Sequence, residues 1–104
     1  IIVKKNGRKS PFDREKLSKS IYIALKKRPI DTDTVEKFIT NISRSLEEMG
    51  QSEIASNTIG TIVMERLKDL DPVAYVRFAS VYRNFREEKD FVQFVDKIDV
   101  FKKR

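Results

Sequence analysis

The sequence predicts a mainly α-helical domain, in which an N-terminal β-hairpin is followed by a four-helix bundle and one additional C-terminal helix. Three observations predict this fold class. An Asn-Gly pair lies between strand-forming residues near the start of the chain. Capping residues and helix breakers mark successive helices, and apolar residues recur between them at three- and four-residue spacing. The length of 104 residues is that of one small domain with one core.

Residues 1–12 are predicted to form the hairpin. Ile1–Val3 are strong strand formers, and Asn6-Gly7 is the preferred pair for a type I′ turn, in which both residues have positive φ. The second strand would run back from Arg8. Pro11 has no N–H to donate to a ladder, so it fits an edge or a strand end.

The first helix is predicted from Asp13 to Lys27. Asp13 is a good N-cap, and Pro29 ends the helix. The basic residues 26–28 would lie in the last turn, where they complement the helix dipole. The residues predicted to face the core are Leu17, Ile21, Ala24 and Leu25.

The second helix is predicted to start near Asp31–Asp33 and to run to about Met49, with Gly50 as its C′ residue. Residues 51–55 are expected to be a short connection. The residues predicted to face the core are Val35, Phe38, Ile39, Ile42, Leu46 and Met49.

The third helix is predicted to begin with Ser56 as its N-cap. Gly60 inside this helix costs about 1 kcal/mol relative to Ala, so close approach of a partner or ligand is one explanation for it. The residues predicted to face the core are Ile59, Ile62, Val63 and Leu67.

Asp71-Pro72 predicts the start of the fourth helix, because an N-cap is followed by Pro at the first helical position. Asp90 and Gln93 resemble a capping box that opens a last helix. The core face of the fourth helix would comprise Ala74, Phe78, Val81, Tyr82 and Phe85. The last helix has an aromatic stripe, which either completes the core or forms an oligomer interface: Phe91, Phe94, Val95, Ile98 and Phe101.

The net charge of +6 is unevenly distributed. Residues 1–30 hold ten basic and two acidic residues, whereas residues 31–104 hold 12 basic and 14 acidic residues. A clustered positive field favours a polyanion such as nucleotide phosphate, nucleic acid or anionic lipid. The alternative is a solvated basic face that serves solubility.

Composition excludes several kinds of site within these residues. The chain has no Cys and no His, so it holds no zinc finger, disulfide, thiol nucleophile or His-based triad. It has no Gly-rich phosphate loop, and its carboxylate pairs lie on polar helix faces. We therefore predict that the chain is not an enzyme. No apolar run has the length of a membrane span and no signal-peptide pattern opens the chain.

Side chains near the start of the chain suggest a phosphate site. Lys4 and Lys5 precede the predicted turn, and Lys16 lies in the first turn of the first helix, at its positive dipole end. A hairpin folded over this helix would bring the three cations together, and Ile2 and Val3 could press a flat base against the bundle. The alternative is a hairpin that is merely basic.

Two stretches resemble a known family. The first runs from Val3 to Gly7 and continues from Pro11 to Leu17, and it is similar to the opening of an ATP-cone domain. The second is more specific: Asp71–Phe85 reads DPVAYVRFASVYRNF. Together with the Lys27-Arg28-Pro29 element and Ile59-Gly60, it resembles the NrdR family of bacterial transcriptional repressors of ribonucleotide reductase genes.

The resemblance implies an architecture and a mechanism. An ATP-cone is a nucleotide-binding module with a hairpin lid over a four-helix bundle, which would occupy residues 1–88, with residues 89–104 as a helix that extends the bundle or makes an oligomer contact. The family has a DNA-binding zinc ribbon before the cone, so the absence of Cys and the start at Ile1 lead us to expect that ribbon, and its zinc, just before this chain. ATP and dATP, with Mg²⁺, would alter the homo-oligomeric state and thereby binding to operator DNA in the bacterial cytoplasm, at the nucleoid.

The resemblance also implies nucleotide contacts. Ile2 and Val3 match the strand contact to the base, Lys4 and Lys5 match the two basic residues before the turn, and Lys16 matches the lysine that reaches phosphate. Ser56 and Gly60 match two positions at the start of the third helix. Ser10 stands where many cones have a carboxylate. Tyr75, Arg77, Tyr82 and Arg83 are expected to face either the nucleotide, the core or a partner.

Two alternatives remain at this stage. The chain could be the allosteric cone of a ribonucleotide reductase large subunit, although the RFASVYR stretch argues against this. It could also be a basic helical module that binds nucleic acid directly, which predicts tight and strongly salt-dependent binding.

Overall fold

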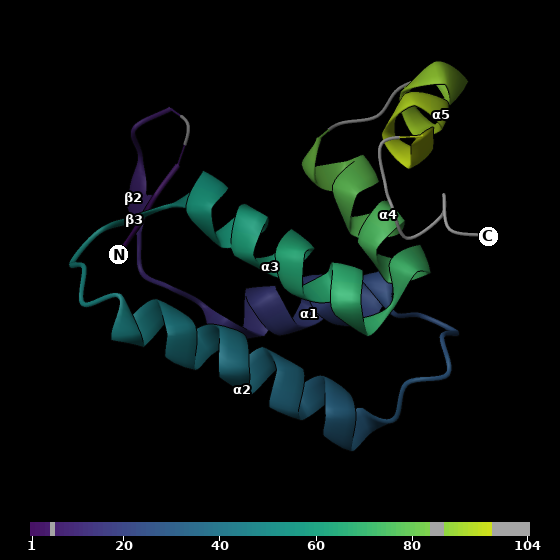
Figure 1. Cartoon of the computed structure of the whole chain (residues 1–104). Coiled ribbons are helices and arrows are strands. Elements are labelled where there is room, and N and C mark those ends of the chain that lie inside the picture. Colours follow the sequence, from purple (N-terminus) through teal and green to yellow (C-terminus); the bar gives the residue numbers. More distant parts are fainter. Residues whose placement is uncertain (5, 84–86, 97–104) are drawn as a thin grey trace.

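The computed structural model describes residues 1–4, 6–83 and 87–96. Within them the chain is mostly helical, with five helices and a small three-stranded sheet (Figure 1). The helices are α1 (Arg14–Ala24), α2 (Thr32–Glu48), α3 (Ser56–Leu70), α4 (Pro72–Tyr82) and α5 (Glu88–Asp96). The strands are β1 (Ile2–Val3), β2 (Lys9–Ser10) and β3 (Ile54–Ala55). None of the described helices is long and apolar enough to cross a membrane.

The hairpin forms, but its turn differs from the predicted type. β1 and β2 are antiparallel, with Ile2 opposite Ser10. Gly7 has a φ of +82°, whereas Asn6 is not among the described residues with positive φ, so the type I′ prediction is wrong. The Lys4 N–H donates to the Arg8 carbonyl and the Asn6 side chain accepts from the Arg8 N–H. Of the described turn residues, Gly7 alone is in the left-handed region.

A third strand lies in the segment that was predicted to be a plain connection. β3 pairs in parallel with β1, so the strand order is β2-β1-β3, and Ile2 lies opposite Ile54. The Ile54 N–H donates to the Ile1 carbonyl at 2.9 Å. Because β3 leads directly into α3, this pairing holds the hairpin beside the N-terminus of that helix.

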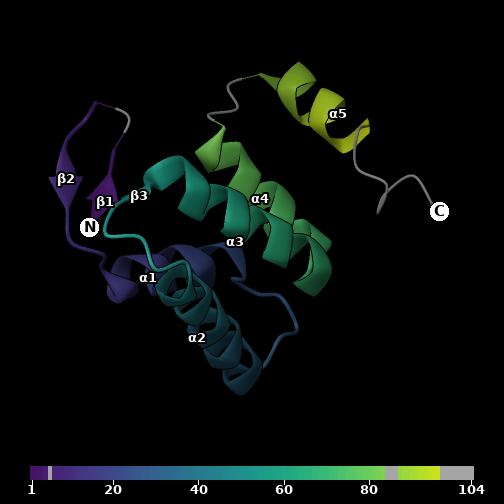
Figure 2. The same ribbon diagram turned by 60° about the vertical axis from the view of Figure 1, so that its left-hand side comes forward.

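The core lies among the first four helices. α1 packs against α2 and α4, and α3 packs against the same two helices. All four residues that were predicted to form the inner face of α1 are buried, and Ile21, Ile39, Ile42 and Leu67 are fully buried. In both views the hairpin lies at one end of this helical body and α5 lies at the other (Figures 1 and 2).

Two predicted core positions are wrong. Val81 in α4 is 82% exposed and Met49, the C-cap of α2, is 36% exposed. Both lie at the C-terminal end of their helix, and no helix among the described residues covers either side chain. Met64 and Ala79, which the pattern did not single out, are buried instead.

Three helix ends also differ from prediction. α1 ends at Ala24, and the chain turns through Lys27 with a φ of +62°, so residues 26–28 follow the helix and are not part of its last turn. Ala55 and not Ser56 is the N-cap of α3. α5 begins at Glu88, so Asp90 is its third residue and not its N-cap. From that position the Asp90 carboxylate accepts from the Glu87 N–H, as the third helical residue of a capping box does.

α5 packs through Phe94. Its side chain is 9% exposed and forms a second small cluster with Met64 and Ala79. The centres of the Phe94 and Tyr75 rings are 5.4 Å apart, and the Arg83 guanidinium lies 5.5 Å from the centre of the Phe94 ring. The predicted contributions of Phe85, Ile98 and Phe101, and of the Phe91 and Val95 side chains, lie outside what the structure describes.

Candidate functional site

A cavity of about 450 Å³ lies where the hairpin meets α1 and α3. The hairpin supplies Ile2, Lys4 and Ser10, and α1 supplies Lys16, Leu17 and Ser20. The N-terminal half of α3 forms another wall, and α4 closes the cavity with two aromatic side chains, Phe78 and Tyr82. The other lining residues are Pro11, Phe12, Asp13, Ser56, Asn57, Ile59, Gly60 and Val63.

The hairpin and α1 are placed around this cavity by a cap. The Asp13 carboxylate accepts from the Glu15 N–H at 2.9 Å and from the Lys16 N–H at 3.4 Å, so it fixes the first turn of α1. The pairing of β1 with β3 then holds Ile2 beside the start of α3. Residues separated by about fifty positions in the sequence therefore share one cavity.

The aromatic wall is fixed by a bond from α4 to α3. The Tyr82 hydroxyl donates to the Asn57 carbonyl at 2.9 Å, and the Tyr82 ring lies over Gly60. The Phe78 and Tyr82 rings are nearly parallel, with their centres 6.1 Å apart. The close approach that the sequence suggested for Gly60 is thus made by a side chain of the same chain.

The electrostatics of the cavity favour an anion. Lys4 and Lys16 are exposed, and neither forms an ion pair within the described part of the chain. Asp13 is the single carboxylate among the lining residues, and it is already bonded to the α1 amides. Ala55 provides no side-chain cap for α3, so the positive end of this helix dipole is not neutralised by a cap.

The structure brings together six of the residues that the sequence proposed for this site. They are Ile2, Lys4, Lys16, Ser56, Gly60 and Tyr82. Val3 belongs to β1 but does not line the cavity, and Lys5 lies outside the described residues. Ser10, where many cones have a carboxylate, does line it.

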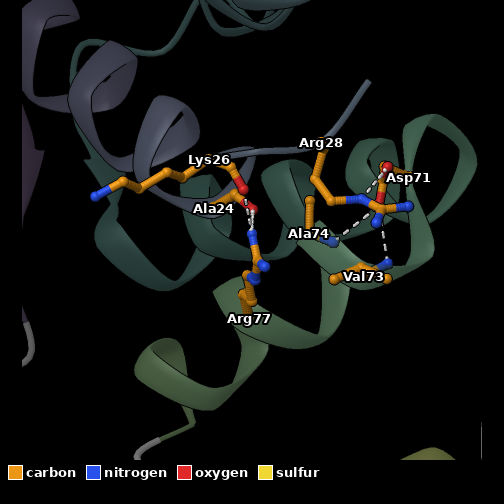
Figure 3. Close-up of polar contacts among 7 residues, drawn as sticks. All are labelled: Ala24, Lys26, Arg28, Asp71, Val73, Ala74 and Arg77. Carbon is orange, nitrogen blue, oxygen red and sulfur yellow. Dashed lines mark hydrogen bonds and ion pairs between the residues drawn. The ribbon is translucent and has the colours of Figure 1, made fainter. Parts of the chain in front are cut away.

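Three residues of the Asp71–Phe85 stretch lie elsewhere. Tyr75 packs against the Phe94 cluster, and Arg83 lies over the Phe94 ring. Arg77 donates to the carbonyls of Ala24 and Lys26, at 3.2 and 2.7 Å, and so completes the C-terminal end of α1 (Figure 3). These three side chains therefore hold elements together and do not reach the cavity.

A second polar contact fixes the start of α4. The Arg28 guanidinium donates to the Asp71 carboxylate at 2.8 Å, and Asp71 also accepts from the N–H groups of Val73 and Ala74 (Figure 3). Burial raises the pKa of Asp71, but the hydrogen bond from Arg28, the two amide bonds and the nearby positive charge together hold it below its ordinary value.

The sequence missed several lining residues. Phe12, Asn57 and Phe78 line the cavity, but none of them was predicted to belong to a site, and Phe78 was predicted only to face the core. No local signal distinguishes them, because they become neighbours only when the hairpin and α4 pack against α3.

The chain is similar to known proteins along its whole length. The family model of the ATP cone domain matches residues 1–88. A transcriptional repressor NrdR from Pelagibacter ubique is 85% identical over 104 residues, which are all of this chain and 68% of that protein. The transcriptional repressor NrdR of Rhodospirillum rubrum is 59% identical over 96 residues, covering 92% of this chain and 63% of that protein. The transcriptional repressor NrdR of Azorhizobium caulinodans is 54% identical over 100 residues, covering 96% of this chain and 58% of that protein. The chain thus spans about two thirds or less of the length of these relatives.

Proposed function

This chain belongs to the ATP-cone family and to the NrdR transcriptional repressors, and we propose that it senses adenine nucleotides for such a repressor. Its relatives are named as repressors, and the protein is not an enzyme. We propose that ATP or dATP binds in the cavity between the hairpin and α3, with the hairpin acting as a lid over a bundle of the first four helices.

The observation that supports this most is the composition of the cavity. Its volume of about 450 Å³ is in the range of small-molecule sites. Most of its lining is apolar, and it includes two exposed lysines that form no ion pair within the described chain. A nucleoside triphosphate has the same division, because its base is flat and largely apolar whereas its phosphates are strongly anionic.

We assign roles to the lining residues on the same basis. Lys4 and Lys16 would bind the phosphates as point charges, together with Lys5 from the turn. Ile2, supported by Val3 in the same strand, would contact the base with Phe12. Ser56 would donate its hydroxyl to the ligand at the start of α3, near Gly60. Mg²⁺ would enter with the triphosphate, since this ion is usually held by phosphate oxygens and waters.

Repression would follow from a change in assembly. We propose that the bound nucleotide sets the homo-oligomeric state of the cone, with residues 89–104 extending the bundle or contributing an oligomer contact. Operator DNA upstream of ribonucleotide reductase genes would be contacted in the cytoplasm by a zinc ribbon that precedes the cone. The opposite charge balance of residues 1–30 and 31–104 supports a nucleotide, rather than a polynucleotide, as the direct ligand of this chain.

Calorimetry and light scattering test the proposal together. We expect ATP and dATP to bind this chain with a Kd tighter than about 1 mM, and CTP to bind at least about tenfold more weakly. Light scattering of the same samples should show a change in mass between the nucleotide-free and nucleotide-bound states. The absence of heat with both adenine nucleotides would contradict a nucleotide site, and an unchanged mass with nucleotide bound would contradict the coupling.

A further inference from the structure

Tyr82 lies where three parts of the molecule meet. It is the last residue of α4, and its ring forms part of the cavity wall. Its hydroxyl is bonded to Asn57 in the first turn of α3. The same side chain packs against the cluster that contains Phe94 of α5. No other residue that the structure describes is placed in the cavity wall, bonded to α3 and packed against this cluster at once.

The position of the Tyr82 ring is closely determined on the α3 side. A Cβ atom at Gly60 would lie 2.8 Å from the Cδ1 atom of the ring and closer still to Cε1, so the ring lies against the helix backbone. The Asn57 carbonyl, which accepts from Tyr82, also accepts from the Thr61 hydroxyl at 2.9 Å. Any shift of α3 at the cavity therefore moves Tyr82 as well.

The α5 side depends on the same end of α4. Arg83 is the C-cap of α4, and its guanidinium lies over the Phe94 ring. Phe94 is 9% exposed, whereas Val92 in the same helix is 52% exposed. α4 lies between α3 and α5 in both views, so the C-terminal turn of α4 is the physical connection between the cavity and α5 (Figures 1 and 2).

We infer that Tyr82 couples occupancy of the cavity to the attachment of α5. A ligand that fills the cavity restrains Tyr82 and the last turn of α4, and thereby holds Phe94 in its cluster. Since coupling between two sites is reciprocal, detachment of α5 must weaken ligand binding by the same factor. The inference rests on the proposed function, because it takes the ligand to be an adenine nucleotide.

The first experiment measures ATP affinity by calorimetry in variants that leave the cavity lining intact. Phe94→Ala should weaken ATP binding at least about fivefold, although Phe94 does not line the cavity. Val92→Ala, on the same helix, should leave the affinity unchanged. Ile42→Val, in the core of α2, controls for a general loss of stability and should also leave it unchanged. An unaltered affinity in Phe94→Ala would overturn the inference.

The second experiment tests the connection through Tyr82 itself. Tyr82→Phe keeps the ring but removes the hydroxyl bond to Asn57. In that background, Phe94→Ala should change ATP affinity by less than about twofold. If the full effect of Phe94→Ala persists in both Tyr82→Phe and Tyr82→Leu, the coupling does not run through Tyr82 and the inference is wrong.

A third experiment needs no ligand. Hydrogen exchange of the amides of residues 58–61 should be at least about fivefold faster in Phe94→Ala than in wild type or in Val92→Ala. If exchange is faster in Phe94→Ala but the wild-type chain binds no ATP, the coupling between α5 and the cavity is supported and only the proposed nucleotide function is contradicted. ATP binding with unchanged exchange in Phe94→Ala would support the function and overturn the coupling.

Discussion

The ring of Tyr82 occupies the place above Gly60 where any other residue would put its Cβ atom. A Cβ atom at Gly60 would overlap three carbon atoms of the Tyr82 ring, and the Tyr82 hydroxyl donates to the Asn57 carbonyl. The glycine therefore allows α4 to close on α3 at the cavity, at the cost of lower helix propensity.

Gly60→Ala should destabilise the protein. Alanine gains about 1 kcal/mol of helix propensity, but overpacking against Tyr82 costs typically 1–3 kcal/mol, so we expect a net loss of about 1 kcal/mol. Denaturant unfolding measures this change. In a Tyr82→Ala background the same substitution should become neutral or stabilising. A stabilising Gly60→Ala in the wild-type background would show that the ring moves aside freely.

Lys4→Met and Lys16→Met should each weaken ATP binding about tenfold or more, because each removes a charge-assisted contact of about 1.5–3 kcal/mol. Lys19→Met is the matched control, since Lys19 lies on α1 but does not line the cavity. Calorimetry at constant salt separates the three variants. Equal affinities in all of them would place the phosphates elsewhere.

Asp71 should make the free energy of unfolding depend on pH in the acid range. Its pKa is lowered in the folded state, so its contribution is present above the ordinary carboxyl pKa of about 4 and is lost as the pH falls through the lower folded value. Asp71→Asn can still cap α4 but cannot ionise. Chemical unfolding between about pH 2 and 6 should therefore show that the free energy of unfolding falls less steeply with decreasing pH in this variant than in wild type. The same dependence on pH in both proteins would rule out this contribution of Asp71.

Arg28→Met tests the same pair from the other side. Loss of the guanidinium should raise the pKa of Asp71 and move the acid loss of stability to higher pH. At neutral pH we expect destabilisation by about 1–3 kcal/mol, less than for a fully buried pair, because Arg28 is partly exposed. Lys26→Met, in the preceding turn, should leave the pH profile of unfolding unchanged.

Lys27→Gly should stabilise the protein. Lys27 has a φ of +62°, a region that costs an L-residue roughly 1 kcal/mol and costs glycine little. We expect a gain of about 0.5–1 kcal/mol in the free energy of unfolding. Lys26→Gly is the control, because Lys26 has no positive φ and should gain nothing. A gain of the same size in both variants would contradict the strain at Lys27.

Local signals in the sequence predicted much of the fold. The caps at Asp13, Asp31 and Asp71 set the starts of three helices, because each side chain bonds to amides within three residues. The apolar spacing in α1 predicted its buried face correctly, since a helix presents residues three and four apart on one side. The basic residues of the hairpin also predicted an anion site near this end of the chain.

Other features depend on contacts between distant residues and could not be read locally. β3 is two residues long and exists because Ile54 and Ala55 pair with β1, more than fifty positions earlier. Val81 fits the apolar stripe of α4 but is exposed, because none of the described elements covers its side chain. Asn57 and Phe78 become cavity residues only when the sheet and α4 close on α3.

By itself, the sequence determined most of the helices, their caps and the basic N-terminal end, which follow from interactions within a few residues or from composition. The likeness to a nucleotide-binding cone came from the resemblance of its motifs to a known family. Only the tertiary structure decided that Arg77 holds the end of α1 and that Tyr82 closes the cavity over Gly60. The physical reason is that both side chains belong to the same short helix, and their partners lie on α3 or at the C-terminal end of α1, whose positions are set by packing of the whole core.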